Sequence, residues 1–504
     1  MTTNSRPKSR DTFVSTSRSA THLNRRLYEK FREQILSGHY RPGVKLPSSR
    51  ALAVGLGVSR NTVNLAFGQL KAEGYIEGRR GSGSYVTRKL PDDLTQPFNR
   101  RSVRQHSNSR LPSGISKRFS ALSDRSALAL APKRVVRAFQ PGIPALDAFP
   151  YALWTKLVTR QWKRQRARLR QMLGYAGAAG LPALCKAICS HLWISRGVQC
   201  QPEQIIVVSG IQQALHLVAQ VLLRPGDPVW IEEPGYFAAQ SVFETAHAKL
   251  IPVKVDADGL NVSAGIAADS RARLVYTTPA NQFPLGVTMS VARRLELLRW
   301  AGKTGAWILE DDYDGEFRYS SRPLPALQSL DQTGSVIYVG SFSKVLFPAL
   351  RLGYLVAPPA LLERLLLAKY AATFHSPTID QAVVAEFIDE GHLLRHVRRM
   401  RALYLERLGV LLDAGRGELN GAVSMVRPDG GMHIVASLPA GADDEKVAIA
   451  ANEAGISSLP MSLCYLGRNR FPGLILGYAA YSPEQIRVGC RRLATVLGQM
   501  STSA

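Results

Sequence analysis

The sequence predicts two domains of different fold class, a small α+β domain followed by a large α/β domain. At 504 residues the chain is too long for a single hydrophobic core. The N-terminal part shows short helical patterns and then two short strands. After about residue 140, apolar runs of strand length alternate with longer helical patterns, which is typical of a mainly parallel sheet.

The net charge of +26 is concentrated near the N-terminus. Residues 1–140 contain 27 lysines and arginines against 8 acidic residues, an excess of 19. Such a front-loaded basic excess favours contact with nucleic acid or an anionic surface. A basic tail that serves only solubility is the alternative.

The rest of the composition is that of an ordinary globular protein. The five cysteines are scattered and form no CxxC pair, so we expect reduced thiols and no metal site. No run of about 18 apolar residues and no apolar signal segment is present, which predicts a chain without a membrane span. We therefore expect a cytoplasmic protein, nucleoid-associated when bound to DNA.

Three helices are predicted at the start of the chain. Leu27, Phe31 and Ile35 recur every four residues and give the first helix its buried face. Ser48 and Ser59 are suitable N-caps for a short second helix and for a third. The third helix is expected to bury one face, made of Val63, Ala66, Phe67 and Leu70.

Polar residues remain at the outward N-terminal end of the third helix. They are Arg60, Asn61, Thr62 and Asn64. A recognition helix carries its base-reading and phosphate-contacting groups at this position. Residues 74–77 and 79–86 then predict two strands around a Gly/Ser turn, and Arg79 and Arg80 would place two cations on that wing.

The strings LPSSR (residues 46–50) and LGVSRNTV (residues 56–63), with the glycine-tipped wing, resemble the GntR-type winged helix-turn-helix. The resemblance covers about 65 residues and implies binding to double-stranded promoter or operator DNA. It nominates Arg50, Ser59, Arg60 and Thr62 as contacts, to which Asn61, Arg79 and Arg80 are added by position. A solvated charge at a helix end is the alternative for Arg50.

We expect the DNA-binding domain over residues 20–89, a linker over 90–139 and an effector domain over 140–500. The linker is rich in Ser, Asn and Gln, and residues 99–139 contain ten basic residues and one acidic residue. This composition predicts a flexible connector. It could follow DNA beside the bound domain, or serve solubility alone.

Five apolar runs predict the strands of the effector domain. These are residues 205–208, 228–231, 274–277, 307–309 and 336–339. In a parallel sheet, ligands bind at the carboxyl ends of the strands. Suitable side chains follow these runs: Ser209, Gly210 and Ile211; Tyr236; Asn281; Asp311 and Tyr313; and Ser341, Ser343, Lys344 and Arg351.

Together these groups match the needs of pyridoxal 5'-phosphate. Lys344 is the predicted catalytic residue, offering an amine for a Schiff base, and Asp311 offers a carboxylate for the pyridine nitrogen. Such a pair at about 4 Å is worth about 4 kcal/mol at an effective dielectric constant near 20. Tyr236 and Tyr313 offer an aromatic face and a phenol. Helix-opening amides, hydroxyls and a guanidinium suit the phosphate.

Each of these residues has an ordinary structural alternative. A lone lysine after a strand is usually a surface charge, Asp311 could cap a helix, and Tyr313 could belong to an interface. The order of the groups along the chain favours the cofactor interpretation.

The strings SGIQQAL, EDDYDGEFRY and SFSKVLFPALRLGY resemble fold-type I pyridoxal-phosphate-dependent aminotransferases over residues 140–500. The combination with a winged helix resembles the MocR/GabR family of regulators. The resemblance implies a cofactor link at Lys344, a ring-nitrogen contact from Asp311, an O3' contact from Tyr313, ring stacking by Tyr236, and phosphate contacts from Ser341 and Arg351. It also implies a head-to-tail homodimer.

Two positions depart from the aminotransferase pattern. Leu474 stands where these enzymes commonly carry the arginine for the substrate carboxylate. The Asn that they carry before the proline of the turn 283–286 is also missing, with Asn281 or Gln282 as replacements. We therefore predict a regulator that senses pyridoxal 5'-phosphate or an amino compound, with at most residual transaminase activity. The alternative is an active aminotransferase with an accessory DNA-binding domain.

Overall fold

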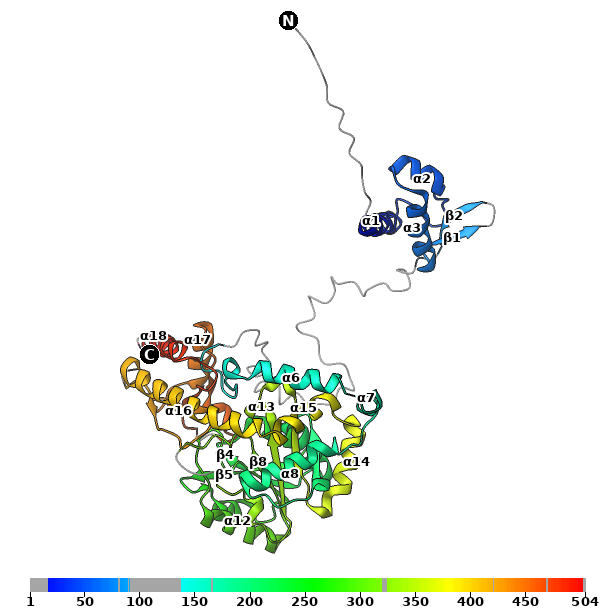
Figure 1. The fold of residues 1–504 in the computed structure, drawn as a ribbon. Coiled ribbons are helices and arrows are strands. Elements are labelled where there is room, and N and C mark those ends of the chain that lie inside the picture. Colours follow the sequence, from blue (N-terminus) through cyan, green and yellow to red (C-terminus); the bar gives the residue numbers. More distant parts are fainter. Residues whose placement is uncertain are drawn as a thin grey trace. The chain divides into compact units, whose positions relative to one another are not determined.

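The computed structural model describes residues 17–79, 82–88, 90, 137–164, 166–319, 324–419, 421–467 and 470–501. The chain divides into two compact units, residues 1–115 and residues 116–504 (Figure 1).

The first unit is a winged helix-turn-helix, as predicted. Its elements are α1 (Ser17–Leu36), α2 (Ser49–Leu56), α3 (Arg60–Ala72), β1 (Ile76–Arg79) and β2 (Gly83–Val86). The Oγ atoms of Ser48 and Ser59 accept hydrogen bonds from the first turns of α2 and α3. Strands β1 and β2 pair antiparallel to form the wing.

The predicted buried faces of this unit are confirmed. Leu27, Phe31 and Ile35 of α1 pack with the inward residues of α3 in one cluster that also contains Ile76 and Val86. Thr62 was expected to face outward, and this prediction is wrong. Its side chain is buried, and its Oγ1 lies 2.8 Å from the Oγ of Ser59. It belongs to the helix cap because the capping serine turns toward it.

The second unit is built on an eight-stranded sheet of mainly parallel strands. The strand order is β3-β10-β9-β8-β7-β4-β5-β6. The bounds are β3 (Ile205–Val208), β4 (Pro228–Glu233), β5 (Lys249–Asp256), β6 (Gly259–Leu260), β7 (Leu274–Thr277), β8 (Trp307–Asp312), β9 (Val336–Ser341) and β10 (Gly353–Val356). All five predicted strands are present. Strand β10, which was not predicted, inserts antiparallel between β3 and β9.

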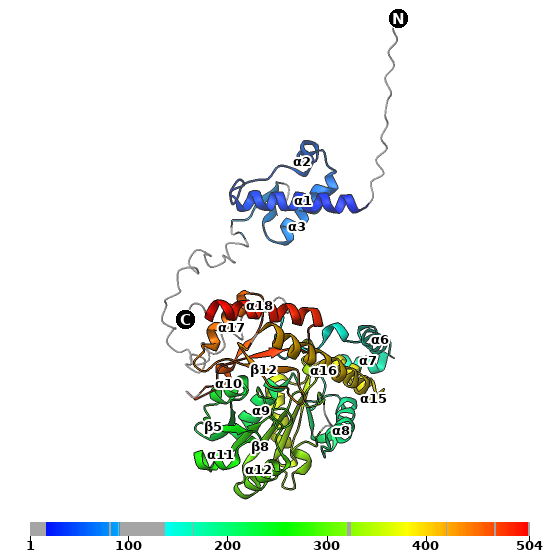
Figure 2. The same ribbon diagram turned by 90° about the vertical axis from the view of Figure 1, so that its left-hand side faces the viewer.

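Helices cover both faces of this sheet (Figures 1 and 2). One face packs against α9 (Ile211–Leu222), α10 (Phe237–Thr245) and α14 (Leu362–Thr373). The other packs against α8 (Pro182–Arg196), α11 (Val262–Asp269), α12 (Val291–Thr304) and α15 (Thr378–Asp389). This three-layer arrangement leaves the carboxyl ends of the strands open for a ligand.

A smaller sheet completes the second unit, with the strand order β11-β12-β14-β13. Its strands are β11 (Ser424–Met425), β12 (His433–Ser437), β13 (Leu459–Pro460) and β14 (Gly473–Gly477), and it packs with α16 (His392–Glu418), α17 (Asp444–Glu453) and α18 (Pro483–Ser501) (Figure 2). The predicted linker lies outside the described residues except for residues 90 and 137–139. Phe139 is fully buried against this subdomain, and its carbonyl accepts a hydrogen bond from the amide of Gly477.

Several negative findings apply to the described residues. None of their helices is long and apolar enough to cross a membrane. Within the same ranges, no group of three or more His, Cys, Asp or Glu side chains could hold a metal ion. The five cysteines are free thiols.

Candidate cofactor pocket and nucleic-acid interface

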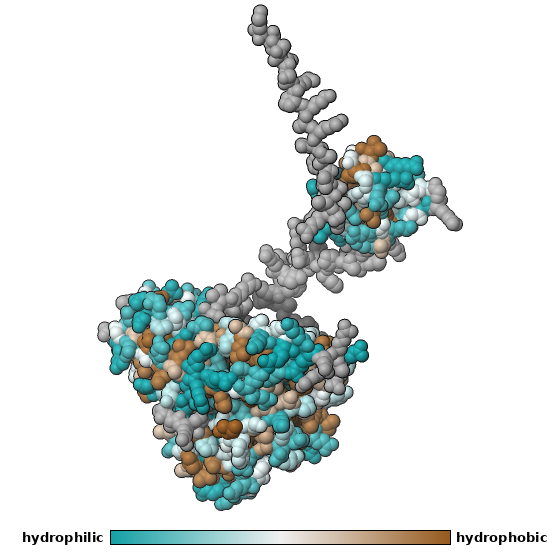
Figure 3. Space-filling view, in the orientation of Figure 1, coloured by the Kyte–Doolittle hydropathy of each residue, from teal (hydrophilic) through white to brown (hydrophobic). Residues whose placement is uncertain are grey.

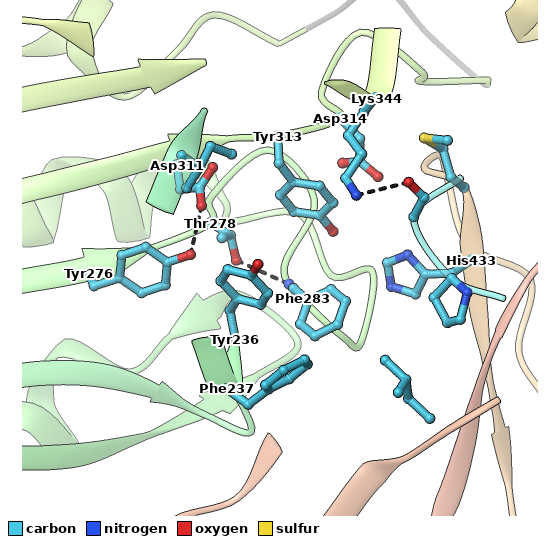
Figure 4. Close-up of a pocket in the computed structure, with 15 residues that line it drawn as sticks. Tyr236, Phe237, Tyr276, Thr278, Phe283, Asp311, Tyr313, Asp314, Lys344 and His433 are labelled. Carbon is cyan, nitrogen blue, oxygen red and sulfur yellow. Dashed lines mark hydrogen bonds between the residues drawn. The ribbon is translucent and has the colours of Figure 1, made fainter. Parts of the chain in front are cut away.

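A cavity of about 270 Å³ lies where strands β4, β7 and β8 of the large sheet end (Figure 4). Five predicted residues line it, namely Ile211, Tyr236, Asp311, Tyr313 and Lys344. Its other lining residues are Pro141, Gly142, Phe237, Tyr276, Thr278, Phe283, Asp314, Met432, His433 and Leu459. Segments more than 300 residues apart in the chain thus form one site.

Asp311 provides a carboxylate oxygen that is available to a ligand. Its Oδ2 accepts a hydrogen bond of 2.7 Å from the hydroxyl of Tyr276, whereas its Oδ1 is buried and has no hydrogen-bond partner among the described residues. Burial raises the pKa of Asp311 to about 7. A protonated ring nitrogen would satisfy Oδ1 and favour the ionised carboxylate.

Lys344 projects into the cavity from α13 (Phe342–Val345). Its Nζ donates a hydrogen bond of 2.9 Å to the carbonyl of Gly142. A Cβ atom at position 142 would lie 2.5 Å from Nζ, so glycine gives the amine its space. Burial lowers the pKa of Lys344, although Asp314 and Asp311 oppose this shift. A lowered pKa favours the neutral, nucleophilic amine.

Two tyrosines lie between Asp311 and Lys344 (Figure 4). Burial raises the pKa of both Tyr236 and Tyr313, so both phenols keep their protons. The hydroxyl of Tyr313 accepts a hydrogen bond of 3.2 Å from Nδ2 of Asn281. Asn281 does not line the cavity and instead positions Tyr313. Gln282 is buried, and its Nε2 donates hydrogen bonds to the carboxylate of Glu232 and to the carbonyls of Pro234 and Phe283.

The start of α9 and Arg351 together make a candidate anion site. Gly210 caps α9 with a φ of +126°, and a Cβ at this position would lie 3.4 Å from Nη2 of Arg351. The guanidinium therefore stands beside the amides that open the helix, where the dipole also favours an anion. Arg351 is exposed and has a φ of +48°.

Ser209 directly precedes Gly210 at this end of α9, and none of the three predicted serines lines the cavity. The amide of Ser209 donates to Oε1 of Gln213, which holds the loop. The Oγ of Ser341 accepts from the amide of Ser343 and caps α13. Their hydroxyl groups still have protons to donate to a phosphate.

The donor set fits pyridoxal 5'-phosphate. Asp311 has an unpartnered oxygen for the ring nitrogen, Tyr313 has a phenol for O3', and Lys344 has an amine for the aldehyde. Gly210 and Arg351 provide the phosphate end, while Tyr236 forms an aromatic wall.

The first unit presents exposed basic and polar groups at the start of its recognition helix. Arg50 follows the start of α2, and Arg60 and Asn61 open α3; all three are exposed. Within the described residues no carboxylate forms an ion pair with Arg50 or Arg60. Ser59 is exposed, but its Oγ is engaged in the helix cap.

The wing carries a second cationic group. The guanidinium of Arg79 lies 4.4 Å from the ring centroid of Tyr85 and pairs with Glu77 at 2.9 Å. Arg80 lies outside the described residues.

The two units match different protein families. Residues 23–86 match "Bacterial regulatory proteins, gntR family", and residues 150–493 match "Aminotransferase class I and II". The probable rhizopine catabolism regulatory protein MocR of Rhizobium meliloti is 40% identical over 482 residues, which cover 95% of each chain. The chain belongs to the MocR family of transcription regulators.

Other relatives agree with this assignment. The HTH-type transcriptional regulator TauR of Rhodobacter capsulatus is 35% identical and covers 94% of this chain and 96% of its own. The crystal structure of LysN, an α-aminoadipate aminotransferase of Thermus thermophilus, covers 77% of this chain and all of its own, with 29% identity and a TM-score of 0.69. The chain thus joins a GntR-type DNA-binding domain to a domain with the fold of the fold-type I aminotransferases.

Ten of the fifteen residues that line this MocR-type pocket were not predicted, and four of them take part in the contacts described above or below. The four are Gly142 in a loop, Tyr276 within β7, Asp314 directly after Tyr313, and His433 at the start of β12. Only Asp314 had a usable signal, because a third acidic residue follows Asp311 and Asp312 at the end of a strand. Long-range topology brings the other three to the site.

The position assigned to the missing carboxylate-binding arginine requires a correction. Leu474 packs into the main core cluster and does not line the cavity. Its neighbour Ile475 packs in the cluster that contacts Phe237, Phe283 and Leu459, and these three line the pocket. Successive residues of a strand face opposite sides, so a one-residue shift in alignment exchanges the two faces. Ile475 packs behind the pocket-lining residues Phe237, Phe283 and Leu459, and it too is apolar.

Proposed function

We propose that this chain binds promoter or operator DNA through its winged helix and that its affinity for DNA changes when the cofactor pocket is occupied. Pyridoxal 5'-phosphate supplies an aldehyde to which amines add reversibly with loss of water. Pyridoxal 5'-phosphate itself or a small amino compound is the effector. The protein acts in the cytoplasm and is nucleoid-associated when it is bound to DNA.

One observation carries this proposal. A single chain contains a GntR-type reader and a pocket in which a buried carboxylate, with one free oxygen, and a buried amine are arranged for one cofactor. An effector can shift DNA binding only through a difference in affinity between two states of the protein. In the pocket, the Lys344 amine and the Asp311 carboxylate are the groups that respond to occupancy.

The DNA contacts follow from exposure and charge. Their exposure and charge support Arg50 and Arg79 as contacts to phosphate oxygens, and Arg60 and Asn61 as contacts in the major groove. We propose that these side chains, with Arg80, form the reading surface. Ser59 keeps its role as helix cap, and Thr62 supports that cap from inside.

We further propose a head-to-tail homodimer. Tyr175, Tyr370 and Phe374 are 92%, 54% and 53% exposed, and their rings form one group. This aromatic group adjoins the candidate anion site. Thr373, next to Phe374, accepts a hydrogen bond from Nε2 of Gln213, and Oε1 of Gln213 accepts one from the amide of Ser209. Figure 3 shows apolar residues scattered among polar ones on the visible face. Exposed aromatic groups of this kind are typical of protein–protein interfaces.

An active aminotransferase is the second candidate. The presence of Lys344, Asp311 and Tyr313 in one pocket favours it, whereas the apolar Ile475 disfavours it, because poor orientation of a substrate can cost several kcal/mol of barrier. Incubation with amino donors and a keto acid distinguishes the two. Multiple turnovers with a common amino acid would establish the enzyme.

The experiment that tests the regulator has two parts. The purified protein should absorb in the visible range, and borohydride should fix the cofactor to wild type but not to Lys344→Ala. In fluorescence anisotropy with DNA flanking the coding region, wild type should bind more tightly than Arg60→Ala, and the affinity should differ with and without pyridoxal 5'-phosphate. An unchanged adduct in Lys344→Ala, or an affinity that is indifferent to the cofactor, would refute the proposal.

A further inference from the structure

The side of the pocket near Lys344 presents hydrogen-bond acceptors. Asp314 is buried and lines the cavity beside Lys344 (Figure 4). Both of its carboxylate oxygens accept from Nδ2 of Asn281, at 2.9 and 3.0 Å. A carboxylate oxygen can accept two hydrogen bonds, so one amide N–H leaves capacity on both oxygens. Asp314 is thus fixed in place and has room for a donor from a ligand. Burial raises the pKa of Asp314 to about 8, and an ammonium group beside it would favour the ionised carboxylate.

His433 provides a second acceptor. Its Nε2 lies 3.1 Å from the carbonyl oxygen of Pro284, which can only accept, so Nε2 carries the hydrogen. Burial lowers the pKa of His433 to about 4, and the ring is neutral near pH 7. The other ring nitrogen, Nδ1, therefore has a lone pair. His433 lines the same cavity as Asp314.

The lining lacks the group that a carboxylate ligand needs. Among the described residues that line the cavity, Lys344 is the one cation, and its amine is required by the cofactor. Behind Phe237, Phe283 and Leu459 packs Ile475, which is also apolar. A carboxylate placed here would be desolvated without a countercharge and would face Asp314.

The remaining wall is apolar. Phe237, Phe283, Met432 and Leu459 line the cavity on this side. They suit a short hydrocarbon segment between the amine that reaches the cofactor and the group that meets Asp314.

We infer that the effector is a primary amine that carries no carboxylate and has a second hydrogen-bond donor, an ammonium or a hydroxyl group, for Asp314 and His433. This inference rests on the proposed function and specifies the ligand class of that site. The ammonium and the hydroxyl share the donor chemistry, and the experiment distinguishes them.

The test uses three amines of equal chain length on the cofactor-loaded full-length protein. They are 4-aminobutan-1-ol, 1,4-diaminobutane and 4-aminobutanoate, which differ only in their terminal group. Binding is followed by the shift in the visible absorption of the cofactor and by the change in DNA affinity.

The alcohol and the diamine should bind at least about tenfold more tightly than the carboxylate. Equal or tighter binding of 4-aminobutanoate would overturn the inference. If none of the three shifts the spectrum, the inference fails, whereas the proposed function fails only if pyridoxal 5'-phosphate leaves the DNA affinity unchanged.

Substitution of Asp314 identifies the contact. Asp314→Asn should weaken binding of 1,4-diaminobutane about tenfold, while 4-aminobutan-1-ol should change by about threefold or less, because an amide still accepts a neutral donor. Asp429→Asn is the matched control, since Asp429 is 62% exposed and lies outside this cavity. Loss of diamine binding in the control, or unchanged binding in Asp314→Asn, would remove Asp314 from the site. The comparison of the three amines on wild type holds even if Asp314→Asn does not fold.

Discussion

At the scale of single residues, the buried carboxyl group of Asp311 makes the stability of the second unit depend on pH. Its carboxyl group has a pKa of about 7 in the folded chain against an ordinary value of 3.8, because the group is buried. The folded state therefore holds this proton more tightly than the unfolded state. The resulting stabilisation is fully present below pH 3.8 and is lost as the pH rises through about 7.

This shift predicts a pH-dependent difference between wild type and Asp311→Asn in the cofactor-free protein. From about pH 4 to about pH 8 the wild type should lose a few kcal/mol of unfolding free energy relative to the variant, since one pKa unit corresponds to about 1.4 kcal/mol. Urea unfolding followed by tryptophan fluorescence measures the second unit alone, because all six tryptophans lie within residues 154–307. Parallel pH profiles for the two proteins would contradict the assignment.

The residues that sequence reasoning identified share one property, which is their place directly after a predicted strand. Asp311, Tyr313, Lys344 and Tyr236 were found in this way, and all four line the cavity. His433 could not be found, because its position depends on how the small sheet packs against the turn at Pro284. The position of the missing carboxylate-binding arginine was assigned to Leu474, one residue before Ile475. An all-apolar strand has no alternation of polar and apolar residues that would show which residues face which side.

At the scale of elements, α3 provides the clearest test. Its inward residues were predicted from periodicity alone and are all buried, which leaves Arg60 and Asn61 exposed at its N-terminus. The error at Thr62 has a local cause. A threonine three residues after a capping serine can complete the cap, and a helical pattern alone does not distinguish this role from an outward one.

The substitution Arg60→Ala should show whether Arg60 contacts a phosphate or a base of the DNA. Loss of a phosphate contact should weaken binding to every DNA sequence and lower the salt slope by about one. Loss of a base contact should instead cost about 1–3 kcal/mol on the operator and relax specificity at one position. Lys71→Ala, near the C-terminal end of the same helix, is the control. Operator binding by Arg60→Ala equal to wild type at moderate salt would place the recognition helix elsewhere.

At the scale of the whole molecule, the fold class and the two-domain plan could be predicted, whereas the sheet order could not. Buried strand patterns reveal the strands but not their neighbours, and β10 was missed as a short run after the Lys344 motif. The docking of Phe139 onto the C-terminal subdomain was also unforeseen, because no local pattern encodes a contact with Gly477 more than 300 residues away.

The proposed dimer gives a prediction at this scale. Replacing Tyr175 and Phe374 by serine together should weaken self-association at least about tenfold, since exposed aromatic residues often carry about 2 kcal/mol or more at an interface. Val426→Ser is a matched control, because Val426 is 82% exposed and directly follows β11. Sedimentation equilibrium measures the dissociation constant. A double variant that dimerises like wild type would exclude this surface.

The central claim is that the cofactor pocket and the DNA reader are energetically coupled. Thermodynamic linkage makes this coupling reciprocal: the factor by which pyridoxal 5'-phosphate changes the affinity for DNA must equal the factor by which DNA changes the affinity for pyridoxal 5'-phosphate. We expect both titrations on wild type to give the same factor, about tenfold, and Lys344→Ala to reduce it toward one. Equal DNA affinities for the cofactor-free and cofactor-loaded wild type would show that the two units act independently and would contradict the account.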